Sequence, residues 1–391
     1  MPGEQLARIN GDVLRWARER VGETLETLGP RVNVDAATVG SWETGVQSPA
    51  FRKAQKLARL LHVPFGFLFL STVPRDDIRL PDLRTVAGRP PRVASPEFVE
   101  LLYSVILKQQ WYRELLLEEG RAALPFVGKF NTQSTVDEVS EDIRATIGIN
   151  DDLRRASVTW EDFLRRLVIL TERAGVLVLR SSIVGNQTRR PLSVDEFRGF
   201  AISDQLAPCV FINGRDAKTA QIFTLVHEIA HVWLGASGIS NPDFRERPAR
   251  QANSTERLCN AVAAEVLVPR ARFRDSWNDR ESITHNMVAL ATAFRVSTVV
   301  VLRQAYDLDL ITQEQFFAHL RREQQRWNAA QNRTEADGGN FYASLRLRNS
   351  AALTEAIVES AQEGKLLRRD AARLLSLKVP TFEKLSARLF E

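Results

Sequence analysis

The chain has 391 residues, of which 44% are hydrophobic and 26% charged, and a formal net charge of +5. It is too long for one ordinary core, so we expect two to four packed modules. No apolar stretch would cross a bilayer, and the first residues lack the pattern of an export signal, so we expect neither a membrane protein nor a secreted one. Two cysteines exclude a disulfide scaffold and favour the reducing cytoplasm.

The first module, residues 1–73, is predicted to consist of short helices separated by turns. The expected helices cover residues 12–20, 23–28, 35–42 and 50–61. Short helices of which one can enter a groove are what helix-turn-helix DNA binding requires. The sequence therefore predicts a domain of that kind.

The DNA-reading side chains of this module are few. The expected recognition helix offers Thr38 and Ser41 but no Arg, Lys, Asn or Gln, and residues 1–70 hold nine basic against seven acidic residues. Arg52 and Lys53, near the start of the next helix, are further candidates for phosphate contacts. The alternative is a dimerisation or partner-binding module, and a homodimer is one form it could take.

A connector is expected over residues 74–150. Three prolines within residues 84–96 predict an extended link, and two amphipathic helices follow at residues 96–119 and 136–147. Their apolar faces must be buried, so we expect them to dock onto the next domain.

The central domain, residues 151–327, should contain a small sheet in front of its most informative helix. A helix is predicted at residues 160–173 and strands at 176–179, 199–202 and 209–213. An edge strand beside a catalytic centre would let a peptide bind by adding itself to the sheet.

The helical run 218–234 carries the sequence His227-Glu228-Ile229-Ala230-His231. Two imidazoles four residues apart lie on one helix face, where both can reach a single metal ion. Glu228 projects beside them, which leaves it free to accept a proton from water at the metal. The pattern predicts a zinc-dependent hydrolase with Glu228 as general base.

A third ligand is expected on the helix over residues 254–269. Glu256 is favoured because Asn260, one turn later, could hold an imidazole N–H from behind. Glu265 is the competing carboxylate, and Glu256 could also be a solvated residue at a helix start. Cys259 is a possible soft ligand but fits a small buried side chain equally well.

Other parts of the chain leave their roles open. The loop 236–253 is a candidate gate or an ordinary mobile loop, and His285, Tyr306 and His319 are candidate oxyanion donors that no spacing separates. Three helices are expected between residues 283 and 325. After a linker at 328–340, about three helices should fill the rest of a C-terminal unit, 328–391, and its net charge of +4 from residue 321 onward does not predict nucleic-acid binding by itself.

Together these segments resemble the ImmA/IrrE family of metallo-endopeptidases, in its long form preceded by an XRE-type helix-turn-helix. The likeness rests on the His-Glu-x-x-His helix, the helix from Glu256 to Pro269, and Trp42-Glu43-Thr44-Gly45 in the first module, and Leu80 to Thr85 is similar to the family's connector. The resemblance implies zinc ligands at His227, His231 and Glu256, with Glu228 as general base. The family usually has Ala at the position of Cys259.

We therefore predict a cytoplasmic, mostly helical α+β protein with a zincin-like peptidase core. The resemblance implies a protein substrate such as a repressor, antitoxin or other regulator, cut in a stress, phage or toxin–antitoxin setting. One alternative is a DNA-binding regulator or antitoxin whose peptidase-like domain binds a partner without cutting it. Another is a scaffold that needs zinc only for folding.

Overall fold

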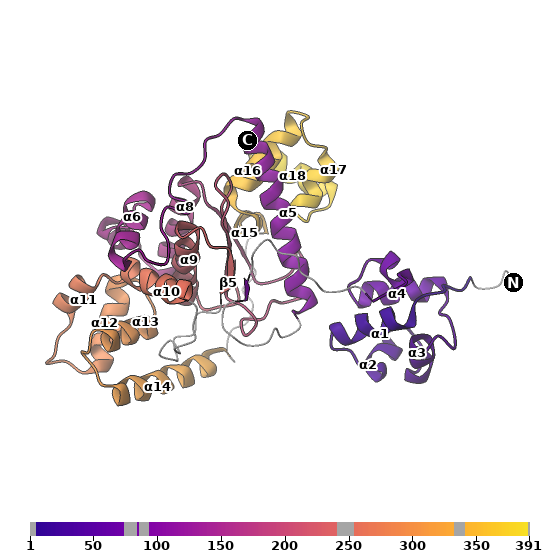
Figure 1. The fold of residues 1–391 in the computed structure, drawn as a ribbon, viewed down its shortest axis with the longest axis horizontal. Helices are drawn as coiled ribbons and strands as arrows, with labels where there is room; N and C mark the ends of the chain where they lie inside the picture. Colours follow the sequence, from indigo (N-terminus) through magenta and orange to yellow (C-terminus); the bar gives the residue numbers. More distant parts are fainter. Residues whose placement is uncertain (1–4, 74–83, 86–93, 241–253, 332–340, 390–391) are drawn as a thin grey trace. The chain divides into compact units, whose positions relative to one another are not determined.

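The computed structural model describes residues 5–73, 84–85, 94–240, 254–331 and 341–389 (Figure 1). These residues form 18 α-helices and one small sheet, so the protein is a mostly helical α+β chain as expected. It divides into two compact units, one from residues 1–80 and 90–102 and the other from 81–89 and 103–391. Most of the expected gate loop, residues 241–253, and of the second linker, 332–340, lies outside the described residues.

The N-terminal unit is a bundle of short helices around one apolar core. Its elements are α1 (Gly11–Arg20), α2 (Leu25–Arg31), α3 (Ala36–Glu43), α4 (Phe51–Leu60) and the 3-10 helix η1 (Phe65–Phe69). Side chains of Asn10, Thr24 and Asp35 cap the first three helices, which fixes where each begins. Leu14, Leu28 and Leu57 are among the fully buried core residues.

Helix α2 differs from the prediction because it continues past residue 28 to Arg31 and includes Pro30. The turn that follows α2 leaves no room for a side chain at Gly29. A Cβ on this glycine would lie 2.9 Å from the carbonyl oxygen of Val34, so the following turn folds back closely over it. The backbone N–H groups of Val32 and Val34 both donate to the carbonyl of Gly29.

The second unit is organised around a sheet with the strand order β1-β5-β3-β4-β2. The strands are β1 (Arg84–Thr85), β2 (Leu177–Ser181), β3 (Gly199–Ile202), β4 (Cys209–Asn213) and β5 (Gly238–Ser240). β3 runs antiparallel to β4 and β5, whereas β2 is parallel to β4 and β1 parallel to β5. Three strands were expected. β5 falls in the segment predicted as a loop, and because it pairs with β3, β3 is not an edge strand.

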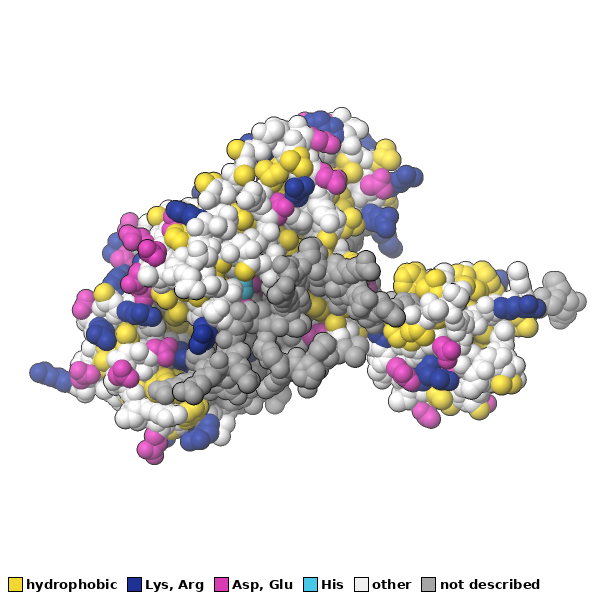
Figure 2. Space-filling model, viewed as in Figure 1, with side chains coloured by type: hydrophobic (Ala, Val, Ile, Leu, Met, Phe, Trp, Pro, Cys, Tyr) yellow, Lys and Arg dark blue, Asp and Glu magenta, His cyan; other side chains and the backbone are white. Residues whose placement is uncertain are grey.

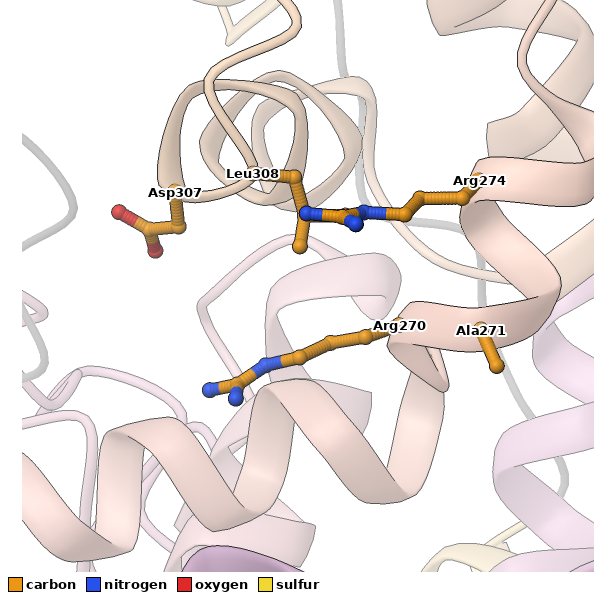
Figure 3. A pocket seen from close by; sticks show the side chains of 5 residues that line it. All are labelled: Arg270, Ala271, Arg274, Asp307 and Leu308. Carbon is orange, nitrogen blue, oxygen red and sulfur yellow. The ribbon is translucent and has the colours of Figure 1, made fainter.

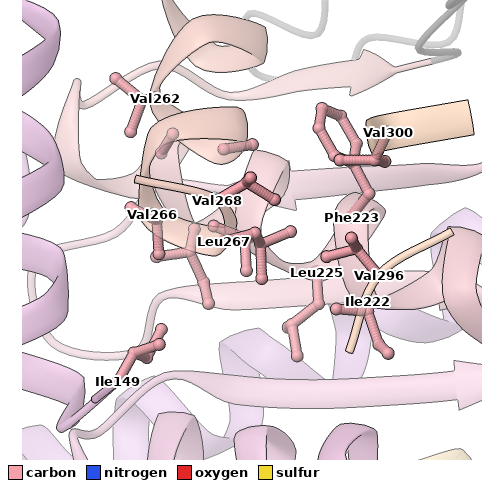
Figure 4. Close-up of a cluster of buried hydrophobic side chains, with 14 of the residues drawn as sticks. Ile149, Ile222, Phe223, Leu225, Val262, Val266, Leu267, Val268, Val296 and Val300 are labelled. Atoms are coloured by element: carbon pink, nitrogen blue, oxygen red, sulfur yellow. The ribbon is translucent and has the colours of Figure 1, made fainter. Parts of the chain in front are cut away.

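One face of the sheet is covered by α9 (Lys218–Trp233), which contacts β3 and β4 and packs against α10 (Ser254–Leu267). Helices α6 (Val136–Ile147) and α8 (Trp160–Arg173) complete this side (Figure 1). Figure 4 shows the apolar contact region, where Ile222, Phe223 and Leu225 of α9 meet Val266 and Leu267 of α10. The helix expected to carry the metal ligands thus lies in the centre of the core.

The other face is covered by α5 (Pro96–Glu118) and α15 (Phe341–Asn349) (Figure 1). Gln109 of α5 donates to the carbonyl of Ala207 at 3.0 Å, and Arg113 pairs with Asp204 at 2.9 Å. α5 therefore docks at the turn between β3 and β4, in agreement with the expected docking of the connector helices.

The remaining helices extend this core. They are α7 (Asp151–Ala156), α11 (Arg270–Ser276), α12 (Ile283–Phe294), α13 (Thr298–Asp307), α14 (Gln313–Gln331), α16 (Ala351–Gln362), α17 (Arg368–Leu374) and α18 (Val379–Leu389). The C-terminal helices contact α8, because the backbone N–H of Ala351 donates to the Glu172 carboxylate at 3.1 Å. Within the described chain, no single helix is long and apolar enough to cross a membrane; α12 and α13 together reach that length and composition only as a pair bent by 110°.

Candidate metal centre

The candidate metal centre lies on α9, which is buried on all sides. Every side chain from Gln221 to Trp233 is buried, and His227 and Glu228 have no exposed surface. An all-apolar helix would have the lowest desolvation cost at this position, because a buried polar side chain needs a partner that compensates for the loss of water. The polar residues of the His-Glu-x-x-His segment therefore stand out against their surroundings.

Three side chains converge here from two helices. The Nε2 atoms of His227 and His231 are 3.2 Å apart, and Glu256 of α10 places its carboxylate oxygens 3.3 Å from the first and 2.8 Å from the second. Ligand atoms arranged tetrahedrally around zinc at its usual bond lengths lie about 3.3 Å from one another. The two imidazoles and the carboxylate thus match a single ion in spacing and in donor type.

The protonation states suit a metal as well. Burial lowers the pKa of His227, which favours the neutral imidazole that binds metals. Burial alone would raise the pKa of the Glu256 carboxyl, but hydrogen bonds from His227 and His231 outweigh it and hold that pKa well below its usual range. The centre therefore offers two nitrogen donors and one carboxylate.

Glu228 lies against β3, where Gly199 makes room for it. A Cβ on Gly199 would lie 2.8 Å from Oε1 of Glu228 and 2.6 Å from Cγ2 of Thr224. Any side chain at this position would force the carboxylate or the strand to move. Gly199 was not among the predicted site residues, although a glycine in a strand often indicates such a close approach.

The ends of α9 are held by the rest of the domain. At its start, Gln221 donates to the carbonyls of Gly214 and Asp216 at 3.2 and 2.6 Å. At its end, the N–H of Gly128 donates to Val232 at 3.1 Å, and a Cβ on Gly235 would lie only 3.0 Å from the Cα of Gly128. These contacts prevent α9 from shifting along its axis.

The C-terminal end of α10 is fixed by cationic side chains from other helices. Arg154 donates to the carbonyls of Val266 and Leu267 at 3.1 and 3.0 Å, and Arg144 donates to that of Glu265 at 3.0 Å. Positive charge at a helix C-terminus satisfies carbonyls that lack helical partners. Burial lowers the pKa of Arg154 to about 10, which leaves it charged at neutral pH.

Glu265, the competing ligand, has a different position. Its carboxylate accepts from the backbone N–H of Arg270 at 3.2 Å and lies 3.6 Å from the Arg270 side chain. Figure 3 shows Arg270 and Arg274 extending from α11 along a surface hollow that Asp307 and Leu308 also line. Glu265 therefore faces Arg270 of α11, and none of the residues around this hollow is a metal-centre candidate. The ligand atoms that lie close together are those of His227, His231 and Glu256.

Two neighbours of Glu256 complete the surroundings. The Asn260 side chain raises the pKa of the His227 imidazole and so opposes part of the lowering by burial. Cys259 is fully buried, and burial together with the charges of Glu256 and Glu228 raises the pKa of its thiol. A protonated thiol is a poor metal ligand, so Cys259 fits the role of a small buried side chain.

The candidate oxyanion donors lie in different surroundings. Tyr306 is part of the apolar core and stacks on Phe316 with ring centroids 4.8 Å apart. The His285 imidazole is exposed and lies 3.9 Å from Glu281, which precedes α12. His319 lies on α14, where burial lowers its pKa.

In the N-terminal unit, the proposed DNA contacts lie on two helices. The hydroxyl of Ser41 donates to the carbonyl of Thr38 at 2.7 Å, so it already has an acceptor within α3. Arg52 is exposed and Lys53 half-buried in the first turn of α4. The structure therefore brings no cluster of base-reading side chains to α3.

Three family models match parts of the chain. Residues 171–306 match the IrrE N-terminal-like domain of a peptidase family, residues 14–68 a helix-turn-helix domain, and residues 349–388 a domain of unknown function. No curated protein matches the sequence. The peptidase match covers both helices of the metal centre, and the helix-turn-helix match covers α2 and α3.

Proposed function

We propose that the protein is a zinc-dependent endopeptidase that cuts a regulatory protein. Its residues 171–306 match the IrrE N-terminal-like domain of a peptidase family, and its residues 14–68 match a helix-turn-helix domain. The observation that carries the proposal is the convergence of His227, His231 and Glu256 within 4.8 Å, with Glu228 beside them. The substrate we propose is a repressor, antitoxin or similar regulator.

In the proposed reaction, the chain's own residues position and transfer one proton. His227, His231 and Glu256 would hold the zinc ion, which would supply a Lewis acid for the peptide carbonyl and for water. Glu228 accepts a proton from the attacking water as the new C–O bond forms. The C–N bond then breaks, and Glu228 returns the proton to the leaving amine.

Proteolysis is favoured over a structural metal site by the residue set. A structural zinc site is usually closed by four protein ligands, whereas two His and one Glu leave a position for water or substrate. Glu228, a buried carboxylate beside the three proposed ligands, can also accept a proton from water. The polar α9 face is therefore better explained by catalysis than by stability alone.

The experiment compares parent protein, Glu228→Gln and Glu265→Gln in the source cells, with new protein N-termini identified by mass spectrometry. We expect about one zinc per chain in all three proteins. The target's new N-terminus should appear with the parent and with Glu265→Gln but be reduced about 10²- to 10⁴-fold with Glu228→Gln. Equal cleavage by Glu228→Gln and the parent would contradict the role of Glu228.

A second candidate function is a DNA-binding regulator or antitoxin that binds its partner without cutting it. It is favoured by the helix-turn-helix match, which places a DNA-binding type of domain in the same chain. In that case operator binding or toxin neutralisation should survive both Glu228→Gln and removal of zinc. A function lost with Glu228→Gln, which leaves the three proposed ligands intact, would require catalysis.

A further inference from the structure

The turn between α2 and α3 has a backbone pattern that also follows other helices of the chain, for example at His62 and Asp309. α2 ends at Arg31, Asn33 adopts the left-handed conformation with φ of 58°, and α3 begins at Ala36. The turn is closed by the N–H of Val34, which donates to the carbonyl of Gly29 at 3.1 Å. A short helix, a turn of a few residues and a second helix are the parts of a helix-turn-helix motif.

The same pattern recurs at the C-terminus, 343 residues later. α17 ends at Leu374, Ser376 has φ of 58°, and α18 begins at Val379. The N–H of Leu377 donates to the carbonyl of Ala372 at 2.7 Å, which is the equivalent hydrogen bond. The register of the two motifs is therefore the same residue by residue.

Burial follows this register. At a constant spacing of 343, four buried residues of the first motif correspond to four buried residues of the last: Leu28 with Ala371, Val32 with Leu375, Val39 with Phe382, and Trp42 with Leu385. Both motifs thus bury the inner sides of their two helices and present the same outer side of the second helix. The matching burial is independent of the backbone turn, so the likeness rests on two observations.

The copy of this turn between α12 and α13 shows what a purely structural use looks like. Arg295, between α12 and α13, also has φ of 58°, and Val296 donates to Ala291 at 3.1 Å. Here, however, the second helix is enclosed: Val300, Val301, Leu302, Gln304, Ala305 and Tyr306 are all buried. α18, by contrast, buries only Phe382 and Leu385 among its described side chains.

Charge distinguishes the last motif from the first. Residues 25–43 hold one basic and three acidic residues, a net charge of −2, whereas the equivalent residues 368–386 hold five basic and two acidic residues, a net charge of +3. Lys378 and Lys384 are exposed and form no ion pair within the described chain, and Arg369 has only a 3.7 Å contact to Asp370. Figure 2 shows Lys and Arg side chains on the outer edge of the region that α17 and α18 occupy in Figure 1.

We propose that α16, α17 and α18 form a second helix-turn-helix domain, and that it binds duplex DNA with α18 in the major groove. Arg369 on the first helix and Lys378 at the turn would contact phosphates, because the first helix of such a motif crosses the backbone. Lys384 and Val379, on the exposed side of α18, would lie next to base edges, where an apolar side chain can contact a thymine methyl group.

The test measures binding of the full-length chain to a pool of duplex DNA over a range of salt concentrations. The triple variant Arg369→Ala/Lys378→Ala/Lys384→Ala should bind on the order of 100-fold more weakly at 0.1 M salt, and its salt slope should fall by about 3. A matched control, Arg274→Ala/Arg280→Ala/Arg321→Ala, removes the same charge from exposed positions outside the motif and should bind like the parent.

A second variant separates loss of contacts from loss of fold. Arg369→Lys/Lys378→Arg/Lys384→Arg keeps the charges and should restore most of the affinity. The proposal is overturned if the alanine triple binds DNA like the parent, if the control triple loses as much affinity, or if the parent prefers RNA to duplex DNA. Each outcome is independent of peptidase activity, since none of these residues belongs to the metal centre.

Discussion

The candidate metal centre and the N-terminal unit differ in where their candidate functional side chains lie. In the metal centre the candidate functional side chains are themselves buried: His227, Glu228, His231 and Glu256 are at most 8% exposed. In the N-terminal unit the core consists of apolar residues such as Leu14 and Leu57, and the candidate DNA contacts lie outside it.

This difference determines how separable folding and function are. A buried site is positioned by many contacts, so a change in its surroundings alters both packing and chemistry. A surface site depends on a few side chains whose removal leaves the core intact. Substitutions in the two regions should therefore have different signatures.

The largest expected effect is on metal binding. Glu256→Gln removes the carboxylate charge that pairs with the two imidazoles. Loss of a hydrogen-bonding partner behind a ligand lowers metal affinity by up to about 100-fold, so the loss of a ligand charge should lower zinc affinity by more than that. Competition with a chromogenic chelator would measure the change. Glu265→Gln is the matched control, because that carboxylate faces Arg270 and should leave zinc affinity unchanged. The reverse result would move the third ligand to Glu265.

The second prediction concerns the stability of the N-terminal unit. The expected loss in its free energy of unfolding is similar in size to the loss in zinc-binding free energy expected for Glu256→Gln. Arg18 donates to both carboxylate oxygens of Glu43, at 2.6 and 3.0 Å, and this hydrogen bonding raises the pKa of Arg18. Glu43→Ala leaves the guanidinium without this partner and should destabilise the unit by about 3 kcal/mol. Hydrogen exchange of peptides from residues 5–73 in the full-length protein would show it.

The comparison predicts that zinc content does not change in this variant. Arg15→Ala is a suitable control, because Arg15 lies 3.6 Å from Glu43 and is 45% exposed, so its loss should cost less than about 1 kcal/mol. A loss of zinc on Glu43→Ala would mean that the two regions are not independent.

The approach of β3 to Glu228 gives a third prediction. Gly199→Val places a side chain where the Cβ alone would lie 2.8 Å from Oε1 of Glu228. Displacing this proposed general base by about 1 Å should lower the cleavage rate about 100-fold. Zinc content should stay the same, whereas a conservative change on the same strand, Ile202→Val, should leave both quantities near the parent values.

A smaller effect is expected behind the ligands. Asn260→Ala removes an amide that raises the pKa of the His227 imidazole, and loss of a residue that supports a ligand typically costs 10- to 100-fold in metal affinity. Asn260→Asp should restore part of the affinity because it can still accept a hydrogen bond from an imidazole N–H. Unchanged affinity in the alanine variant would remove Asn260 from the metal centre.

The sequence predicted those features that local geometry determines. A helix alone places His227 and His231 on one face. The strands 199–202 and 209–213 are separated by a short turn, and both strands were predicted with their observed bounds. The bounds of α6 and α8 were predicted as well, because capping residues and apolar periodicity mark them.

Features that depend on distant partners were not predicted. β5 has only three residues, and it is a strand because β3, far away in the sequence, pairs with it. The fit of Gly199 against Glu228 and the capping of α10 by Arg144 and Arg154 also join distant segments. Such contacts leave little periodicity in the sequence, so only the structure shows them.

The smallest expected effect concerns the N-terminal DNA contacts. α3 offers Thr38 and Ser41, and the Ser41 hydroxyl is already engaged by the carbonyl of Thr38, so base reading should contribute little. Arg52 and Lys53 in the first turn of α4 remain available for phosphates. Arg52→Ala/Lys53→Ala should then weaken binding of the full-length chain to the DNA upstream of its gene by about tenfold and lower the salt slope by about 2.

The double change Thr38→Ala/Ser41→Ala is the informative counterpart, because it tests base reading on the same unit. If phosphate contacts dominate, it should alter affinity less than twofold and leave the salt slope unchanged. A loss of sequence preference in this variant would instead assign α3 a direct role in reading bases. If neither pair changes binding, whereas substitution of Arg369, Lys378 and Lys384 does, DNA affinity resides in the C-terminal helices and the N-terminal unit is left as a partner-binding or dimerisation domain.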